Sequence, residues 1–202
     1  YLTHGTLNLN GRTLTVKGNL IQSGGTLEVG KGTLIVNGDY RIQSVKDGQY
    51  GDSTGSLIMN YSAGTIDISG DLVIQTNSLL NHIDSGTINL GGDFYQKNAV
   101  GNKVNFNSGY SLNLVLTEDK NHRIDFEESE KNRLGHLTLK NDVTIQSDVH
   151  IGKLDINGHS MMVEGNMFSD DNVDLNGGTL KVNGSLYHSY GEMFLNRGKI
   201  EI

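Results

Sequence analysis

Hydrophobic and polar residues alternate in short stretches along most of the chain. Leu7 and Leu9 enclose a polar residue, as do Leu14 and Val16, and Gly11 separates the two stretches. A period of two over so few residues is typical of a half-buried β-strand, because successive side chains of a strand point to opposite faces. The pattern therefore predicts many short strands joined by tight turns.

The alternating stretches themselves recur along the chain. Residues 5–23 read GTLNLNGRTLTVKGNLIQS and residues 25–44 read GTLEVGKGTLIVNGDYRIQS, with Thr6 and Thr26 20 positions apart. Related phrases return at 64–76, 86–98, 153–169 and 177–189. Each unit contains three short strands, which suits one turn of a parallel β-helix that rises about 4.8 Å.

We therefore expect an all-β fold, a parallel β-helix (β-solenoid) of about eight coils with three short strands per coil. Residues 1–202 form a single domain in this interpretation. A β-sandwich or barrel is the competing prediction, since Asn-Gly pairs such as Asn37-Gly38 suit hairpin turns. A hairpin fold has no physical reason to repeat its apolar register every 19–22 residues, whereas stacked coils require it.

In every unit, the residue directly after the turn glycine is polar and the second residue after it is apolar. We expect these residues to form one apolar ladder inside the solenoid: Leu20, Tyr40, Leu72, Phe94, Met167 and Leu186. The two aromatic members are then core residues and not parts of a binding site.

Two stretches interrupt the rhythm. Residues 45–55 lengthen one unit, and residues 118–136 have the densest charge in the chain. We expect both to be loop insertions in the solenoid wall, the second with a single helical turn at Glu127–Arg133. Insertions between repeats are common places for function in solenoids.

The amino-acid composition supports many tight turns and argues against several kinds of site and partner. There are 27 glycines and no proline, which fits many tight turns between strands that all donate backbone hydrogen bonds. The absence of cysteine excludes disulfides, thiolate metal sites and cysteine catalysis. The net charge of −7 argues against nucleic acid as a partner, because phosphate binding needs a basic face. No apolar run reaches the roughly 20 residues of a membrane helix, so we expect no membrane insertion.

The two ends of the sequence lie within the repeating pattern. Tyr1 enters in mid-pattern, and Lys199–Ile202 is an alternating strand with no turn after it. We expect a fragment of a longer protein, in which a further domain or coil of the same polypeptide covers the edge of that last strand.

Three aspartates follow the turn glycine in successive units: Asp39, Asp71 and Asp93. They should stack as a column, and stacked carboxylates repel unless they accept backbone N–H groups or bind a cation. Asn19, Asn166 and Ser185 occupy the same place in other units, and residues of this kind cap turns. We favour turn capping, and keep a calcium site at the three aspartates as the alternative. No other metal site and no cofactor is expected, since the seven histidines show no ligand spacing.

The charged stretch 118–136 contains the only other cluster of side chains that could take part in catalysis. It contains the carboxylates and arginines that a polysaccharide lyase or hydrolase of this fold would need: Asp119, Arg123, Asp125, Glu127, Glu128, Glu130 and Arg133. A solvated charged loop is the simpler interpretation. We therefore predict no catalytic residues and no enzyme, with a lyase or hydrolase as the alternative.

Several phrases resemble a known repeat array. GNLIQSGGTLEV, VNGDYRIQ, TGSLIMN, SGDLVIQ, SGTINLGGDFYQ and LNLVLTEDKNHRIDFEES are similar to repeats in large surface proteins of Gram-positive bacteria, chiefly clostridia and paenibacilli. The resemblance covers roughly residues 5–190. It implies an adhesin-like solenoid that is extracellular, either secreted or associated with the cell wall.

The leading functional hypothesis is a structural or adhesive module of a bacterial surface protein, acting as a stalk or as a binding surface. Its partners would be neighbouring domains, a host surface or a polysaccharide. The alternative is a carbohydrate-binding or carbohydrate-processing β-helix. An exposed row of aromatic residues on one wall would favour that alternative, and the candidates are Tyr50, Tyr61, Tyr95, Tyr110, Tyr187 and Tyr190.

Overall fold

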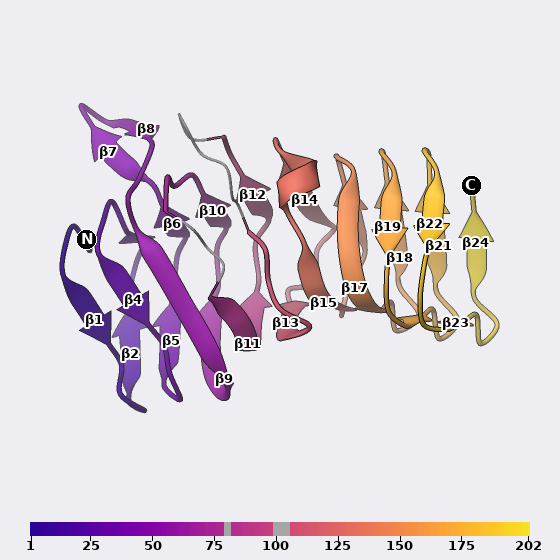
Figure 1. Cartoon of the computed structure of the whole chain (residues 1–202), viewed down its shortest axis with the longest axis horizontal. Helices are drawn as coiled ribbons and strands as arrows, with labels where there is room; N and C mark the ends of the chain where they lie inside the picture. The colour runs from indigo at the N-terminus through magenta and orange to yellow at the C-terminus, as the bar shows by residue number, and fades with distance from the viewer. Residues whose placement is uncertain (79–81, 99–105) are drawn as a thin grey trace.

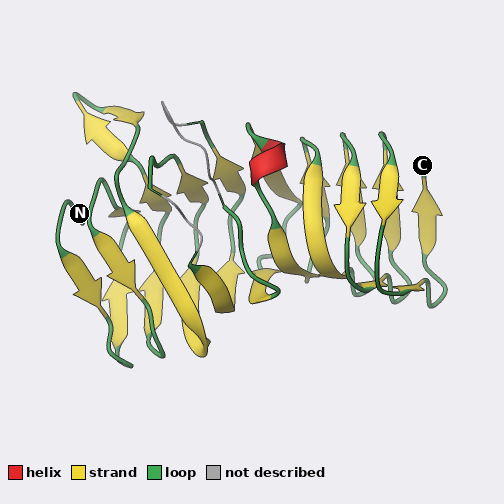
Figure 2. Cartoon of the chain, in the orientation of Figure 1, coloured by secondary structure: helices red, strands yellow, loops and turns green. Residues whose placement is uncertain are grey.

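The computed structural model describes residues 1–78, 82–98 and 106–202. Within these ranges the chain is a β-solenoid of about nine turns, whose coils follow one another along the long axis in Figure 1. The all-β parallel fold is the predicted one, with one coil more than expected. Figure 2 shows strands throughout and a single short helical turn, η1 (Ser129–Lys131).

Three walls, here called faces 1, 2 and 3, enclose the core. Face 1 contains β1 (Thr6–Asn8), β4 (Thr26–Glu28), the first parts of β9 (Ser56–Ile68), β11 (Ile83–Leu90), β15 (Leu134–Leu139) and β17 (Val149–Asp155), then β19 (Met167–Ser169) and β22 (Leu186–His188). In the coil between β11 and β15, face 1 is represented by Asn107, which forms a parallel bridge with Arg133.

Face 2 contains β2 (Thr13–Val16), β5 (Thr33–Val36), β13 (Ser111–Leu116), the second parts of β9, β11, β15 and β17, then β20 (Val173–Asp174) and β23 (Met193–Phe194). Face 3 contains β3 (Leu20–Ile21), β6 (Tyr40–Ile42), β10 (Leu72–Ile74), β12 (Phe94–Gln96), β14 (His122–Phe126), β16 (Val143–Ile145), β18 (Ser160–Val163), β21 (Thr179–Val182) and β24 (Lys199–Glu201). All the pairings within these faces are parallel.

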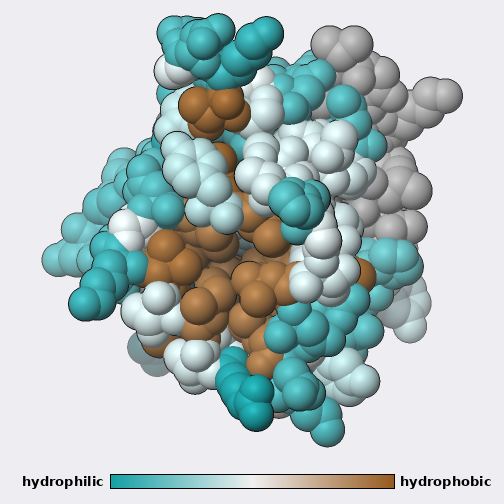
Figure 3. All heavy atoms as spheres, turned by 90° about the vertical axis from the view of Figure 1, so that its left-hand side faces the viewer, coloured by the Kyte–Doolittle hydropathy of each residue, from teal (hydrophilic) through white to brown (hydrophobic). Residues whose placement is uncertain are grey.

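The inward side chains of every coil fill one continuous apolar core. Phe94 lies at its centre and makes edge-to-face contacts with Phe106 and Phe126, at ring-centroid distances of 4.9 Å and 5.3 Å. Figure 3 looks onto the end formed by β1–β3, where apolar side chains gather in the middle and hydrophilic ones surround them. The core therefore extends along the solenoid to its first coil.

The predicted apolar ladder is correct for four of its six members. Leu20, Tyr40, Leu72 and Phe94 pair in register on face 3. Met167 and Leu186 instead continue from Val149 on face 1, so their assignment to this ladder was wrong. The turn glycine that precedes the ladder residue lies between faces 2 and 3 in the first four coils, but between faces 3 and 1 in the last ones. All three strands of a coil share the same alternation of inward and outward side chains, so the repeated sequence phrase can form a strand on any face.

The two predicted insertions have different structures. Residues 44–51 form an antiparallel hairpin, β7 (Ser44–Lys46) and β8 (Gln49–Gly51), which stands out from the solenoid in Figure 1. Residues 118–136 are only partly a loop. His122–Phe126 is strand β14 of face 3, because Ile124 and Phe126 alternate into the core between charged neighbours.

The longer connections share one corner of the solenoid. The hairpin and η1 both lie where the chain passes from face 3 to face 1. The hairpin and η1 thus lie at the same edge, next to face 1.

Candidate functional site

The most distinctive surface feature is a stack of three rings on the outside of face 1. His150, Phe168 and Tyr187 come from β17, β19 and β22 and pair in register across three successive coils. The imidazole and the Phe168 ring are 4.4 Å apart and 7° from parallel, and the Phe168 and Tyr187 rings are 4.9 Å apart and 5° from parallel. We call these three residues the aromatic stack.

Local sequence explains why the rings face outward. Val149 and Ile151 flank His150 and are buried, so the alternation of β17 turns the imidazole to the surface. Met167 and Leu186 place Phe168 and Tyr187 in the same way. Parallel in-register strands then superimpose the rings at about the 4.8 Å spacing of neighbouring strands, which is close to a stacking distance.

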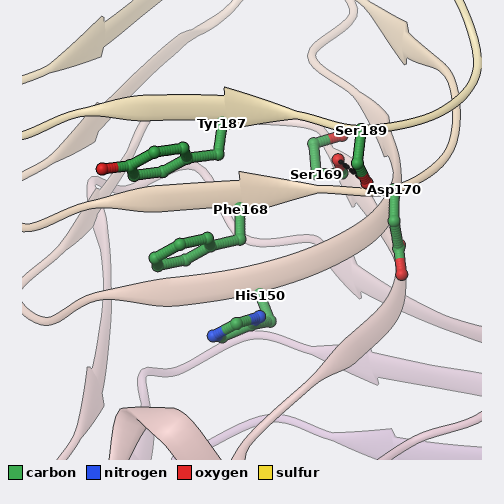
Figure 4. Close-up of a pocket in the computed structure, with 6 residues that line it drawn as sticks. All are labelled: His150, Phe168, Ser169, Asp170, Tyr187 and Ser189. Atoms are coloured by element: carbon green, nitrogen blue, oxygen red, sulfur yellow. Dashed lines mark hydrogen bonds between the residues drawn. The ribbon is translucent and has the colours of Figure 1, made fainter.

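A surface depression of about 230 Å³ lies beside the stack. It is lined by His150, Phe168, Ser169, Asp170, Tyr187 and Ser189. Figure 4 shows the rings on one side of this group, and Asp170 with the two serines at the other end of the strands. A depression with an aromatic wall and a few polar groups at its rim is typical of a ligand-binding site.

An ion pair fixes the polar rim. Arg133 donates from Nη2 to Asp170 Oδ1 over 2.9 Å, and the Tyr110 hydroxyl donates to the other carboxylate oxygen over 3.0 Å. The hydrogen bond to Asp170 raises the pKa of Tyr110 above its ordinary value, and desolvation adds to the effect. Both oxygens of Asp170 thus already have partners within the chain, which makes this carboxylate a poor candidate for acid or base chemistry.

The geometry of the stack limits what can bind to it. Phe168 has a neighbouring ring against each face, so only its edges are accessible. Tyr187 is 53% exposed and has one ring face without an aromatic neighbour. The site therefore offers ring edges, one ring face and the Ser189 hydroxyl, a set of groups that suits binding.

The predicted aspartate column exists. Asn19 Oδ1 accepts the Asp39 N–H, Asp39 Oδ1 accepts the Asp71 N–H, and Asp71 Oδ1 accepts the Asp93 N–H, at 2.8–2.9 Å. Asp93 Oδ1 in turn accepts the Arg123 N–H at 3.1 Å. Each side chain thus caps the same corner of the next coil, which supports the turn-capping interpretation.

Positively charged side chains of the protein already bind the aspartates of this column. Arg41 binds Asp39 at 2.8 Å, and Lys120 binds Asp93 at 2.8 Å. Partial burial would raise the pKa of Asp93, but the hydrogen bonds from Lys120, the Arg123 N–H and Tyr95 outweigh it and leave that pKa below its ordinary value. Among the described residues no group of three or more His, Asp or Glu side chains could hold a metal ion.

A second capping column occupies another corner. Asp148 Oδ1 accepts the Asn166 N–H at 2.7 Å, and Asn166 Oδ1 accepts the Ser185 N–H at 2.9 Å. Asn166 and Ser185 were predicted to share the position of Asn19. Asn166 shares its capping role, and Ser185 provides an N–H that is capped. Both lie between faces 3 and 1, for the reason that displaces Met167 and Leu186.

The structure divides the predicted acidic cluster between two places. Asp125 pairs with Arg123 on the outside of β14, and Glu127 pairs with Lys97 and accepts the Asn98 N–H. Arg133 points away to Asp170. Glu127, Glu128 and Glu130 remain together and line a surface depression of about 240 Å³, whereas Asp125 lies on face 3.

One cluster on face 2 resembles a hydrolytic triad in composition. His136 Nε2 lies 2.8 Å from Asp155 Oδ2 and 3.2 Å from Thr138 Oγ1. In a triad the carboxylate and the nucleophile use different ring nitrogens, so that a proton can pass between them. Here both partners meet the same nitrogen, and the arrangement is a hydrogen-bond network on the wall.

The predicted tyrosines do not form a row. Tyr50 lies on the hairpin beside Arg41, Tyr95 lies on face 3, and Tyr61 and Tyr110 lie near the corner between faces 1 and 2. Only Tyr187 belongs to the aromatic stack. His150 and Phe168 were missed because only tyrosines were considered; their intervals of 18 and 19 residues match the coil length and could have revealed them.

The fold and the site together define the chain as a β-solenoid protein with an aromatic depression on one lateral face. No protein-family model, curated protein or solved structure matches it. Within the described residues there is no helix of the length and apolarity needed to cross a membrane.

Proposed function

We propose that this chain is a rigid structural module of a secreted or cell-wall-associated bacterial protein, which spans distance and presents a lateral binding surface. The parallel pairing of face 3, which is continuous from β3 to β24, supports the proposal. At about 4.8 Å per coil, the stack of about nine coils is a rod about 40 Å long.

The resemblance of its repeats to those of clostridial and paenibacillal surface proteins agrees with this role. The rod would separate neighbouring domains of the polypeptide, and the corner with the insertions would face a host surface or a polysaccharide. Catalysis is not part of the proposal.

A pair of labels tests the rigid rod directly. The chain has no cysteine, so Lys17→Cys and Lys181→Cys introduce two unique labelling positions at exposed sites near opposite ends. Pulsed electron spin resonance should give one narrow distance distribution between the labels, unchanged by neighbouring domains. A broad distribution would show a flexible array and refute the spacer role.

Display at the surface has its own test. Trypsin applied to intact source cells, or the culture medium itself, should yield peptides of this chain, while a cytoplasmic marker stays intact. Recovery of the chain only after cell lysis would refute the extracellular location and leave the rod itself untouched.

Carbohydrate binding is the second candidate, and the depression beside the aromatic stack is the observation that favours it. Isothermal titration with cello-, xylo- and chito-oligosaccharides should show binding that Tyr187→Ala and Phe168→Ala weaken. Tyr50→Ala is the matched control, because Tyr50 is similarly exposed (47%) but lies on the hairpin, away from the depression. No heat of binding with any of the three series, or equal loss in the control, would refute it.

A further inference from the structure

Three stacked turns between faces 2 and 3 have the same unusual backbone. They are Asn157-Gly158, Asn176-Gly177 and Asn196-Arg197, in three successive coils, and all six residues have φ between 43° and 87°. Asn and Gly tolerate this left-handed region better than other residues. The three turns therefore have similar backbone conformations, although their sequences and hydrogen bonds differ.

Asn157-Gly158 is held on both sides by neighbouring coils. The Asn157 amide donates from Nδ2 to the Leu139 carbonyl over 3.1 Å, and the Gly158 N–H donates to the Leu175 carbonyl over 3.2 Å. The side-chain amide of Asn157 and the backbone N–H of Gly158, the two groups that react when an Asn-Gly pair deamidates, are thus both hydrogen-bonded.

Asn176-Gly177 lies between two coils and has neither bond. Among the described residues, the Asn176 side-chain amide and the Gly177 N–H have no hydrogen-bond partner, and both residues are exposed. A Cβ added at Gly177 would meet its nearest neighbour only at 4.0 Å, so this turn has space to rearrange.

Asn196-Arg197 is the third case. The Asn196 amide donates to Asp174 Oδ1 over 3.0 Å, and a long side chain follows it in place of a glycine. A side chain on the residue after Asn hinders the approach of the backbone nitrogen to the amide carbon. Of the three turns, only the middle one combines a glycine with free reacting groups.

We propose that Asn176-Gly177 is a site of spontaneous modification, at which Asn176 deamidates through a succinimide. The Gly177 nitrogen attacks Asn176 Cγ and gives up its proton, the Cγ–Nδ2 bond breaks, and ammonia leaves. Water then opens either carbonyl of the ring to give aspartate or isoaspartate. The sequence is redox-neutral and needs no reagent other than water.

The products should weaken the solenoid locally. Isoaspartate adds a methylene to the backbone at a corner that packs between two other coils, and either product places a new carboxylate beside Asp174, whose Oδ1 accepts the Asn176 N–H at 3.0 Å. The modification would therefore accumulate with age in a long-lived protein and loosen its last coils. This inference does not depend on the proposed spacer function.

Peptide mapping by mass spectrometry tests it, with the folded protein incubated in warm, mildly alkaline buffer. Two hydrogen bonds must first break at Asn157, so we expect Asn176 to react roughly tenfold faster or more. Fragmentation that distinguishes isoaspartate should find both products at position 176. Asn196 should remain almost unchanged.

Denaturant and a variant supply the controls. In the unfolded chain Asn157 and Asn176 are both Asn-Gly sites, so their rates should converge, while Asn196 stays slow. Asn176→Gly keeps the left-handed turn, and its melting temperature should not drift during incubation as that of the parent does. Equal rates at Asn157 and Asn176 in the folded protein, or an unreactive Asn176, would overturn the proposal.

Discussion

The guanidinium of Arg133 lies 3.7 Å from the centre of the Tyr110 ring. Arg133 precedes β15 and Tyr110 precedes β13, so the contact joins two successive coils at the corner between faces 1 and 2. The same Arg133 reaches Asp170 two coils further along, and the rim of the depression is thus braced across four coils. Such cation–π contacts contribute about 0.5–1 kcal/mol at exposed sites.

Gly152 makes room for this contact, and its replacement should disturb the corner. A Cβ at position 152 would overlap the Gly135 carbonyl oxygen and lie 3.0 Å from Arg133 Nη2 and 3.1 Å from the Tyr110 ring. We expect Gly152→Ala to lower the free energy of unfolding by about 1–3 kcal/mol, measured by denaturant titration.

Gly18→Ala is the matched control for that measurement. Gly18 has no atom within 4 Å of an added Cβ and no positive φ, so alanine there should be neutral or slightly stabilising. Equal losses in the two variants would mean that the tight corner at Gly152 is misplaced.

Removal of the central core ring should be costly. Phe94 is fully buried and contacts two further phenylalanines, so Phe94→Ala should lower the free energy of unfolding by about 3–5 kcal/mol. Tyr190→Ala, at a tyrosine that is 76% exposed, should change it by less than about 0.5 kcal/mol. A parent-like melting curve for Phe94→Ala would contradict the position of the core.

The aspartate column should depend on its oxygen acceptors. Asp71→Ala leaves the Asp93 N–H without its acceptor and should cost about 1–3 kcal/mol, while Asp71→Asn keeps an oxygen there and should cost less. Thermal melting of both variants, with and without calcium, distinguishes capping from metal binding. A calcium-dependent rise in the melting temperature of the parent that Asp71→Asn abolishes would favour the calcium interpretation.

Asp93 should make stability fall in acid. Its pKa in the folded protein lies below the value of about 3.9 that an unfolded chain has, so its contribution is complete above that pH. The contribution is lost as the pH falls through the lower, folded pKa. Asp93→Asn cannot titrate, so the difference in melting temperature between parent and variant should be largest near neutrality and vanish in strong acid. A difference that is independent of pH would refute the electrostatic origin.

The sequence by itself determined the coil. The two-residue alternation and the recurring glycine phrase act within a few residues, and together they predict short strands, their stacking and the ladder Leu20–Tyr40–Leu72–Phe94. The capping role of Asp39, Asp71 and Asp93 could be predicted for the same reason, since each side chain serves a turn that its own position in the repeat identifies.

Only the tertiary structure decided which face each strand joins. The three strands of a coil have the same pattern of inward and outward residues, so no local pattern distinguishes face 1 from face 3. Once longer connections change the number of residues per coil, the repeat phrase no longer indicates the face. Met167 and Leu186 are examples. The aromatic stack depends on that assignment, because His150, Phe168 and Tyr187 meet only when their three coils are in register. The bond between Arg133 and Asp170 likewise joins residues 37 positions apart, and the packing of successive coils, which no local pattern encodes, brings them together.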